Sequence, residues 1–141
     1  MIDKQKVLIL CTGNSARSQM AEGILRHLAD DKYDVESAGT IASFVRPQAI
    51  EVMKEIGIDN ISSHRSKSLD EFLDQSFDYI ITVCDNANRS CPVFPGKAER
   101  IHWSIDDPAE AKGTDNEIKL VFIRIRDEIY ERITNFLTTH P

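Results

Sequence analysis

The sequence predicts an α/β fold of three layers, in which helices cover both faces of a four-stranded parallel sheet. Two apolar stretches, residues 7–11 and 77–84, each end in a cysteine, and unbroken apolar strands are typical of parallel sheets buried on both faces. We expect the other two strands at residues 33–39 and 100–103. Because the strands alternate with helical patterns, right-handed crossovers between parallel neighbours are expected.

Two helices are predicted in the N-terminal half of the chain. The first runs over residues 16–29, directly after the first strand. Pro47 opens the second and Gly57 closes it, because proline suits the first helical turn and glycine suits the end. The residues expected to face inward from these two helices are Met20, Ile24, Leu25, Leu28, Ala49, Ile50, Met53 and Ile56.

Two helix starts are predicted from capping-box spacing further along the chain. Ser68 and Glu71 are expected to open a short helix that reaches Gln75, and Thr114 and Glu117 are expected to open the last helix. Apolar residues at helical spacing continue from there to the C-terminus, namely Ile118, Val121, Phe122, Ile125, Ile129, Ile133 and Leu137.

Three polar segments are interpreted as surface connections. Residues 40–46 include Phe44 and Arg46. Either side chain could flank the site, but we favour an ordinary loop. The polar run 62–68 is read as a solvated connection, and residues 85–97 as a loop with one helical turn.

Length and charge limit the possible functions. The 141 residues form one domain, residues 1–141, which we expect to be a monomer. Lys and Arg total 17 against 23 Asp and Glu, so the net charge is −6 and nucleic acid is not expected as a partner. No apolar run approaches the ~20 residues of a membrane span, and because the first strand begins almost at once we expect no signal peptide. Three cysteines, an odd number, indicate a reducing compartment, so we expect a cytoplasmic protein.

The loop after the first strand is predicted to bind an oxyanion. Cys11 ends the strand and Arg17 begins the helix. Backbone N–H groups beside a helix N-terminus attract negative charge, and they also favour the thiolate form of Cys11 as a nucleophile. Arg17 would grip two oxygens of the anion, and Ser18 would donate a hydrogen bond to the sulfur. The alternative is an inert cysteine at the end of a buried strand. The predicted loop residues are Thr12, Gly13, Asn14, Ser15, Ala16 and Arg17.

Cys84 and Cys91 are candidate redox partners of Cys11. Their spacing is neither a C-x-x-C redox motif nor a usual zinc pattern, and the four histidines do not complete a metal site, so no metal is expected. Ligands of open α/β sheets bind beyond the carboxyl ends of the strands, so Cys11 and Cys84 are expected at one crevice. Three thiols there would make a disulfide relay. Since disulfide bonding requires Cα atoms within about 7 Å, the loop would have to move. The alternative is that both are incidental.

Asp107 is the candidate proton donor. It follows the last strand, and Pro108 restricts the backbone beside it. A carboxylic acid held over an oxyanion can protonate a leaving oxygen. The alternative is an ordinary turn aspartate. For His64 and His102 we expect structural roles, because no partner is evident in the sequence.

With these residues in place, the chain resembles the thioredoxin-coupled arsenate reductases, which share the low-molecular-weight tyrosine phosphatase fold. The resemblance covers nearly the whole chain. It is carried by Cys-Thr-Gly-Asn-Ser-x-Arg-Ser-Gln-Met-Ala-Glu-Gly at 11–23, Ser-Ala-Gly at 37–39, the pair Cys84 and Cys91, and His-Trp followed by Asp-Asp-Pro at 102–108.

The resemblance implies a complete reaction. Cys11 attacks arsenate and forms a thiol-arsenic adduct, and Asp107 assists the loss of an oxygen. Cys84 then attacks Cys11, which releases arsenite and leaves a transient Cys11–Cys84 disulfide. Cys91 takes over the bond, and thioredoxin reduces the Cys84–Cys91 disulfide. The resemblance implies no bound cofactor, because the reducing equivalents come from thioredoxin.

Two departures from the family pattern carry expectations. Family members often have a further cysteine in the oxyanion loop, where this chain has Ala16, but the relay uses the other three thiols. Some relatives bind potassium through residues that match Asn14, Glu22 and Ser37, together with an aspartate. That aspartate matches Lys67 here, so we expect an ammonium group in place of the cation and no dependence on potassium.

Two other functions remain open at this point. A phosphatase acting on phosphotyrosine or small phosphate esters would use the same loop, arginine and aspartate, but it needs neither Cys84 nor Cys91. A tyrosine-specific phosphatase would usually carry aromatic residues after the Asp-Pro pair, where this chain has Ala109 and Glu110. A regulatory module that only binds oxyanions would leave all three thiols unreactive.

Overall fold

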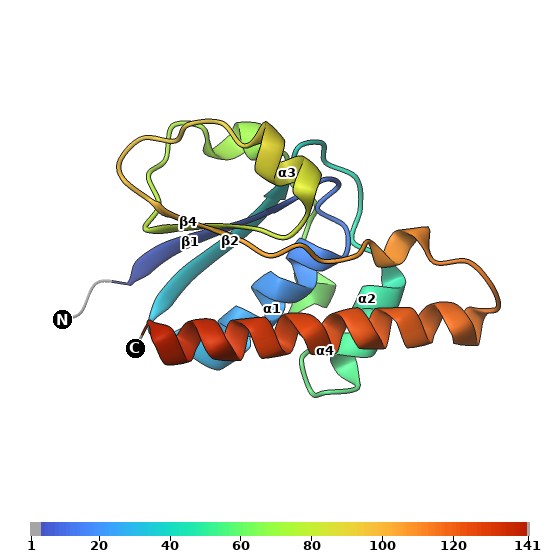
Figure 1. The fold of residues 1–141 in the computed structure, drawn as a ribbon. Helices are drawn as coiled ribbons and strands as arrows, with labels where there is room; N and C mark the ends of the chain where they lie inside the picture. Colours follow the sequence, from blue (N-terminus) through green and yellow to red (C-terminus); the bar gives the residue numbers. More distant parts are fainter. Residues whose placement is uncertain (1–3, 141) are drawn as a thin grey trace.

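The computed structural model describes residues 4–140 and contains the predicted four-stranded parallel sheet, in the order β2-β1-β3-β4 (Figure 1). All three strand pairs are parallel, and Leu8 of the central strand pairs with Glu36 on one side and Ile80 on the other. The fold class predicted from the sequence is confirmed. The strands are β1 (Gln5–Cys11), β2 (Tyr33–Gly39), β3 (Tyr79–Thr82) and β4 (Glu99–His102).

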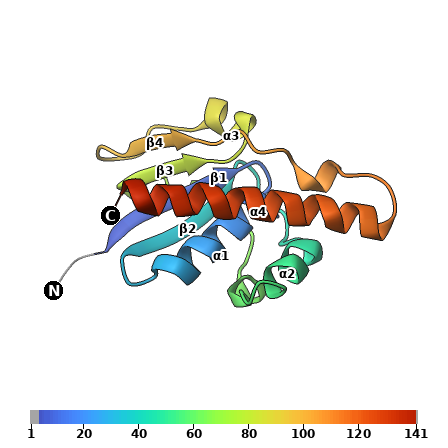
Figure 2. The same cartoon turned by 60° about the horizontal axis from the view of Figure 1, so that its bottom comes forward.

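Helices lie on both faces of this sheet. Figure 1 shows α1, α2 and α4 on one side and α3 on the other, and Figure 2 shows α4 crossing in front of α1. Thr114 and Glu117 form the predicted capping box at the start of α4. The helices are α1 (Arg17–Ala29), α2 (Pro47–Lys54), α3 (Asp85–Ser90) and α4 (Asp115–Thr139), with short 3-10 turns at Asn60–Ser63, Leu69–Phe72 and Pro108–Glu110.

The core is built around β1, which is buried on both faces. Parallel crossovers place helices on each side of the sheet, so the strand has no solvent-facing side chains in its second half. The rest of the core comes from the inner faces of α1 and α4 and from an aromatic cluster at the start of the sheet. Its fully or nearly fully buried members include Val7, Leu8, Ile9, Leu10, Met20, Ile24, Leu25, Ile81, Phe122, Ile125 and Ile129.

Two of the predicted inward positions are wrong. Leu28 is 38% exposed. The buried face of α1 passes from Leu25 to Ala29, which lies four residues further along the helix, and so bypasses Leu28. Ile56 is 37% exposed, because α2 ends at Lys54 and the chain turns before reaching it; Val52 takes the inward position.

The predicted capping box at Ser68 and Glu71 is also wrong. Ser68 does cap a turn, but it accepts from Asp70, and the turn is a 3-10 helix of four residues that does not reach Gln75. Both carboxylate oxygens of Glu71 accept from Arg65.

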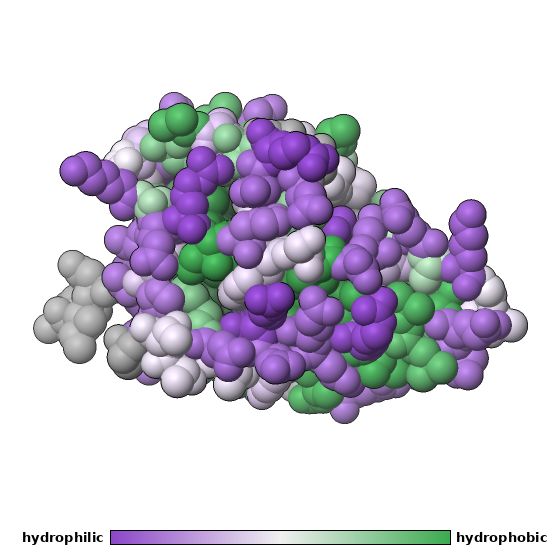
Figure 3. Space-filling view, in the orientation of Figure 1, coloured by the Kyte–Doolittle hydropathy of each residue, from purple (hydrophilic) through white to green (hydrophobic). Residues whose placement is uncertain are grey.

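The surface is mostly hydrophilic in the view of Figure 3, with apolar side chains gathered over the N-terminal half of α4, where Leu120 is 57% exposed. Among the described helices, none combines the length and the apolar character that crossing a bilayer requires.

Truncation of the central strand should cost much of the stability. Ile9 is fully buried in β1, so Ile9→Ala is expected to lower the free energy of unfolding by about 2–5 kcal/mol, through lost burial and a cavity. Ile41 is 69% exposed, and Ile41→Ala should stay within about 0.5 kcal/mol. Urea denaturation of both variants provides the measurement, and equal midpoints for the two would contradict this description of the core.

Candidate active site

Two cysteines lie at the carboxyl edge of the sheet. Cys11 is the last residue of β1, and Cys84 follows the neighbouring strand β3. The sulfur of Cys84 lies 3.3 Å from Thr12 Oγ1, directly beside the loop that Cys11 begins. Both cysteines are buried and neither is in a disulfide. The two strand ends therefore place Cys84 beside the loop that Cys11 begins, although Cys84 is not among the residues that line the cavity at Cys11.

The loop after Cys11 directs hydrogen-bond donors at its sulfur. The backbone N–H of Asn14 donates to Cys11 Sγ at 3.2 Å, and Ser18 Oγ lies 2.8 Å from the same atom. Ala16, the residue before α1, provides no side-chain cap, so the first N–H groups of the helix stay open towards the loop. Such an arrangement stabilises negative charge on a thiolate or on a bound oxyanion.

Asn14 fixes the shape of this loop. It has φ of 48°, in the left-handed region, which asparagine tolerates better than most residues. Its side-chain amide donates to Ser18 at 2.8 Å and to Ser37 at 2.9 Å. Its side-chain oxygen accepts from Gln19 at 2.9 Å and from the backbone N–H of Lys67 at 2.8 Å. Because Asn14 is fully buried, these bonds hold the loop in one conformation.

Arg17 and Asp107 form the wall opposite the thiol. Arg17 Nη1 donates to the carbonyl of Ile105 at 2.9 Å, and Arg17 Nη2 lies 3.5 Å from Asp107 Oδ2. Asp107 Oδ1 accepts from the N–H of Ala109, which orients the carboxyl group. Together these elements enclose a cavity of about 170 Å³, lined by Cys11, Thr12, Gly13, Ser15, Ala16, Arg17, Ser43, Arg46, Asp107 and Ala109. A nucleophile, a guanidinium and a carboxyl group thus face one small space, which suits attack on a tetrahedral oxyanion.

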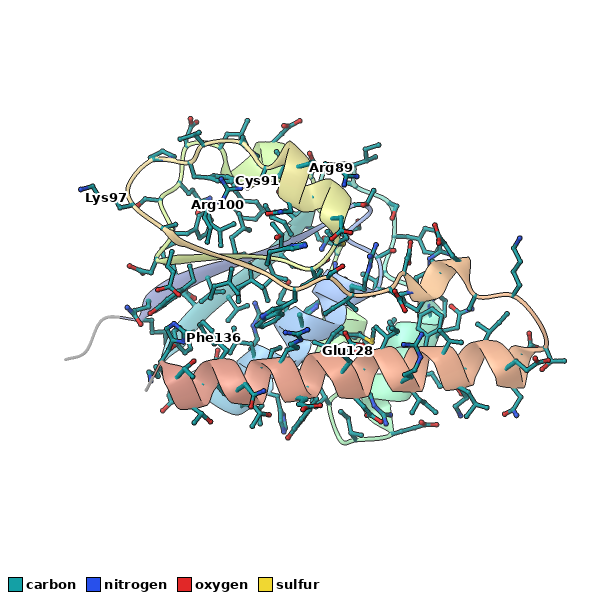
Figure 4. All side chains as sticks on the ribbon, viewed as in Figure 1. Arg89, Cys91, Lys97, Arg100, Glu128 and Phe136 are labelled. Carbon is teal, nitrogen blue, oxygen red and sulfur yellow. The ribbon has the colours of Figure 1, made fainter. Side chains whose placement is uncertain are left out.

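Cys91 lies at the other end of α3 from Cys84, and Figure 4 shows it near Arg89 and Arg100. Its thiol is half-buried, and burial raises its pKa while Arg100 opposes the rise. At about 1.5 Å of rise per residue, the seven residue steps from Cys84 to Cys91 span about 10 Å. That separation exceeds the ~7 Å that a disulfide allows between Cα atoms. The residues of α3 must therefore rearrange before these two thiols can bond.

Lys67 lies behind the oxyanion loop. From the sequence we expect its ammonium group to take the place of the potassium ion that some relatives bind there. Its Nζ contacts Glu36 at 2.6 Å and lies 3.8 Å from the buried Glu22. His64 joins the same cluster, 3.3 Å from Glu22 and 3.2 Å from Arg26. Burial lowers the pKa of His64, so it is neutral near pH 7 and packs as a structural residue outside the cavity. Arg26 pairs with the buried Glu22 carboxylate at 2.9 Å, and the ammonium group of Lys67 adds a second positive charge beside it.

His102 also lies outside the cavity. Its Nδ1 is 2.7 Å from Thr82 Oγ1 and its Nε2 is 2.9 Å from Asp85 Oδ1. The hydrogen bond from His102 lowers the pKa of Asp85. His102 therefore connects β4 to the first turn of α3.

Sequence reasoning missed several residues that build the site. The run 62–68 is not simply a solvated connection, because Ser66 donates to the carbonyl of Gly13 and Lys67 is 7% exposed. Ser43 also donates to Gly13, and both Ser43 and Arg46 line the cavity. Periodicity gave no signal for these residues, since they reach the loop only through tertiary packing.

Comparison with known proteins supports a common ancestry along nearly the whole chain. The family described as low molecular weight phosphotyrosine protein phosphatase matches residues 6–140. An arsenate reductase of Halalkalibacterium halodurans is 49% identical over 138 residues, which covers 98% of this chain and 99% of the relative. An arsenate reductase of Bacillus subtilis is 42% identical over the same shares of the two chains.

Solved structures give the same relationship. An arsenate reductase in the phosphate binding state is 33% identical, with a TM-score of 0.76 over 96% of this chain and 98% of that chain. A low molecular weight protein tyrosine phosphatase from T. tengcongensis is 28% identical, with a TM-score of 0.80 over 96% of this chain and 99% of that chain. The family resemblance stated from the sequence is confirmed.

A methyl group at Gly39 should disrupt the loop. A Cβ there would lie 2.5 Å from the carbonyl oxygen of Thr12 and 2.7 Å from the backbone nitrogen of Asn14. Gly39→Ala is expected to cost about 1–3 kcal/mol of stability and to weaken phosphate binding, since both atoms belong to the loop. At Gly13 the nearest atom is the mobile Ser43 hydroxyl at 3.2 Å, so Gly13→Ala should be milder. Calorimetric titration with phosphate checks both, and equal affinities in Gly39→Ala and wild type would refute the close packing.

Potassium should add no stability beyond that given by sodium. The Lys67 ammonium group already lies beside Glu22 and Glu36, so there is no uncompensated carboxylate for the ion to bind. We expect equal Tm values in potassium and sodium chloride at the same ionic strength. A Tm several degrees higher in potassium would show that a specific cation site exists.

Proposed function

This chain belongs to the low molecular weight phosphotyrosine protein phosphatase family, and from that premise we propose that it reduces arsenate to arsenite with its own thiols. The observation that carries the proposal is the position of Cys84, whose sulfur is 3.3 Å from Thr12 in the oxyanion loop. Phosphate ester hydrolysis has no use for a second thiol there. The relatives named arsenate reductase, at 42–49% identity over almost the full chain, support the same choice.

The first step is nucleophilic attack on arsenic. The loop N–H groups and Arg17 hold the oxyanion, while Asn14 and Ser18 donate to the Cys11 sulfur. The sulfur forms a bond to arsenic, and one oxygen leaves as water after it receives a proton from Asp107. Arsenic remains in the +5 state. The carboxyl group of Asp107, 3.5 Å from Arg17, is placed to reach an oxygen bound by that guanidinium.

The second step transfers electrons between sulfur and arsenic. The Cys84 thiolate attacks Cys11 Sγ, so a disulfide forms and the sulfur–arsenic bond breaks. The electron pair of the broken bond stays on arsenic, which leaves as arsenite in the +3 state. Two thiols are oxidised for each arsenate reduced. The neighbouring positions of Cys11 and Cys84 at the ends of β1 and β3 make this transfer short.

The third step moves the disulfide to the surface. The Cys91 thiolate attacks Cys84 Sγ and frees Cys11, which leaves a Cys84–Cys91 disulfide. Opening α3 is the conformational cost of this step, and it is small, because Ala87 is the only buried residue among the described side chains of the helix. A dithiol protein of the thioredoxin class then reduces the disulfide. Exposed Arg89 and Arg100 near Cys91 favour a partner with an acidic surface (Figure 4).

The second candidate is a phosphatase, because the same cavity would hold a phosphate ester. A phosphatase would differ from the reductase because it needs only the thiol of Cys11. The 3-10 turn after Asp107 presents Ala109 to the cavity, without an aromatic side chain to receive a tyrosine ring. The two additional thiols and this small residue make the reductase the better supported function.

Replacing Cys91 should stop the relay after one cycle. Cys91→Ser is expected to release about one arsenite per chain and to trap Cys11 bonded to Cys84, because no thiol remains to take over the disulfide. Mass spectrometry of the intact chain and of its peptides would detect the loss of two hydrogens and identify the bond.

Cys11→Ser provides the control, since it should release no arsenite at all. Multiple turnovers by Cys91→Ser with thioredoxin as the only reductant would remove Cys91 from the relay. Unchanged mass after arsenate treatment of the wild type, combined with hydrolysis of phosphate esters, would support the phosphatase.

A further inference from the structure

Arg46 is a second guanidinium at the oxyanion cavity. It precedes α2, and its backbone N–H donates to the carbonyl of Ser15 at 2.9 Å, which ties this residue directly to the oxyanion loop. Its side chain lines the same cavity as Cys11 and Arg17. Arg46 therefore lines the cavity that also contains the reacting cysteine, although the sequence favoured an ordinary loop for it.

The side chain of Arg46 has no protein acceptor among the described residues. Its Nε is buried without a hydrogen-bond partner, and no carboxylate of the described chain pairs with the guanidinium. The contact it makes is with the exposed ring of Phe44, whose centroid lies 4.8 Å from the guanidinium carbon. Arg17 differs, because it donates to Ile105 and faces Asp107.

An unpaired buried guanidinium donor is costly, and native structures rarely leave one without a reason. Arginine offers five N–H donors in a planar fork, which match the oxygens of a tetrahedral oxyanion. The cation–π contact with Phe44 holds the fork in place without consuming any of these donors. The missing acceptor is therefore most simply an oxygen of the anion that the cavity binds.

We propose that Arg46 binds the substrate oxyanion together with Arg17 and the loop N–H groups, and so determines affinity for tetrahedral dianions such as arsenate and phosphate. This proposal deepens the function proposed above by adding a binding residue to the same site. Arg46 acts on the bound anion before and during attack alike, so it lowers KM and leaves kcat nearly unchanged.

The test uses phosphate, which needs no redox chemistry. Arg46→Gln is expected to raise the Kd of the reduced protein for phosphate about tenfold or more, since a charge-assisted hydrogen bond is lost. Arg46→Lys keeps the positive charge but loses the planar guanidinium group, so its phosphate Kd should lie between those of wild type and Arg46→Gln. Arg132→Gln, an exposed position on α4, makes the same change in net charge and should match wild type. Isothermal titration calorimetry gives the affinity and the stoichiometry, which should be one phosphate per chain.

Two further measurements complete the test. Phosphate should raise the Tm of Arg46→Gln less than it raises that of wild type, because the variant binds the anion more weakly. With arsenate, KM should rise by the same factor as the phosphate Kd while kcat stays within about twofold.

An unchanged phosphate Kd in Arg46→Gln would overturn the proposal. So would an equal rise in Tm with phosphate in the variant and in wild type, or loss of only a second, weaker phosphate site. Because phosphate binding is measured in the absence of turnover, failure of the wild type to reduce arsenate would contradict the proposed function and leave this result standing.

Discussion

The conformation of Asn14 is the constraint on which the site depends. Its left-handed backbone turns the loop so that its own N–H points at Cys11. Its buried side-chain amide donates to Ser18 and Ser37 and accepts from the backbone N–H of Lys67, and these bonds hold it there. These partners come from a helix, a strand and a distant loop. The oxyanion loop is therefore rigid because three separate parts of the chain converge on one buried amide.

The proposed thiol relay would combine this rigid loop with a short helix that has little buried surface. The Cys11 side is fixed by buried polar contacts, whereas α3 is a short helix with little buried surface and with cysteines at both ends. Cys84 belongs to both parts, because its sulfur contacts Thr12 and also accepts from Ala87 in the first turn of α3. A change at Cys84 is thus transmitted directly to the helix that separates it from Cys91.

Much of the fold could be predicted, because apolar runs and helical spacing are local signals. They placed Cys11 and Cys84 at strand ends, and parallel pairing made them neighbours. The residues that could not be placed from the sequence also have physical reasons. Leu28 was misplaced because the buried stripe drifts along a helix, and Lys67 and Arg46 reach the site through packing between segments far apart in the chain. No periodicity or capping rule reports such contacts.

The reactivity of the three thiols tests most directly whether the loop makes Cys11 an oxyanion-site nucleophile. The reduced protein would be alkylated with iodoacetamide, with and without phosphate, and the modification of each cysteine followed by mass spectrometry. We expect Cys11 to be protected by phosphate, because the anion occupies the cavity that the sulfur lines, while the more exposed Cys91 reacts equally in both cases. Alkylation of Cys11 at the same rate with saturating phosphate would contradict the account.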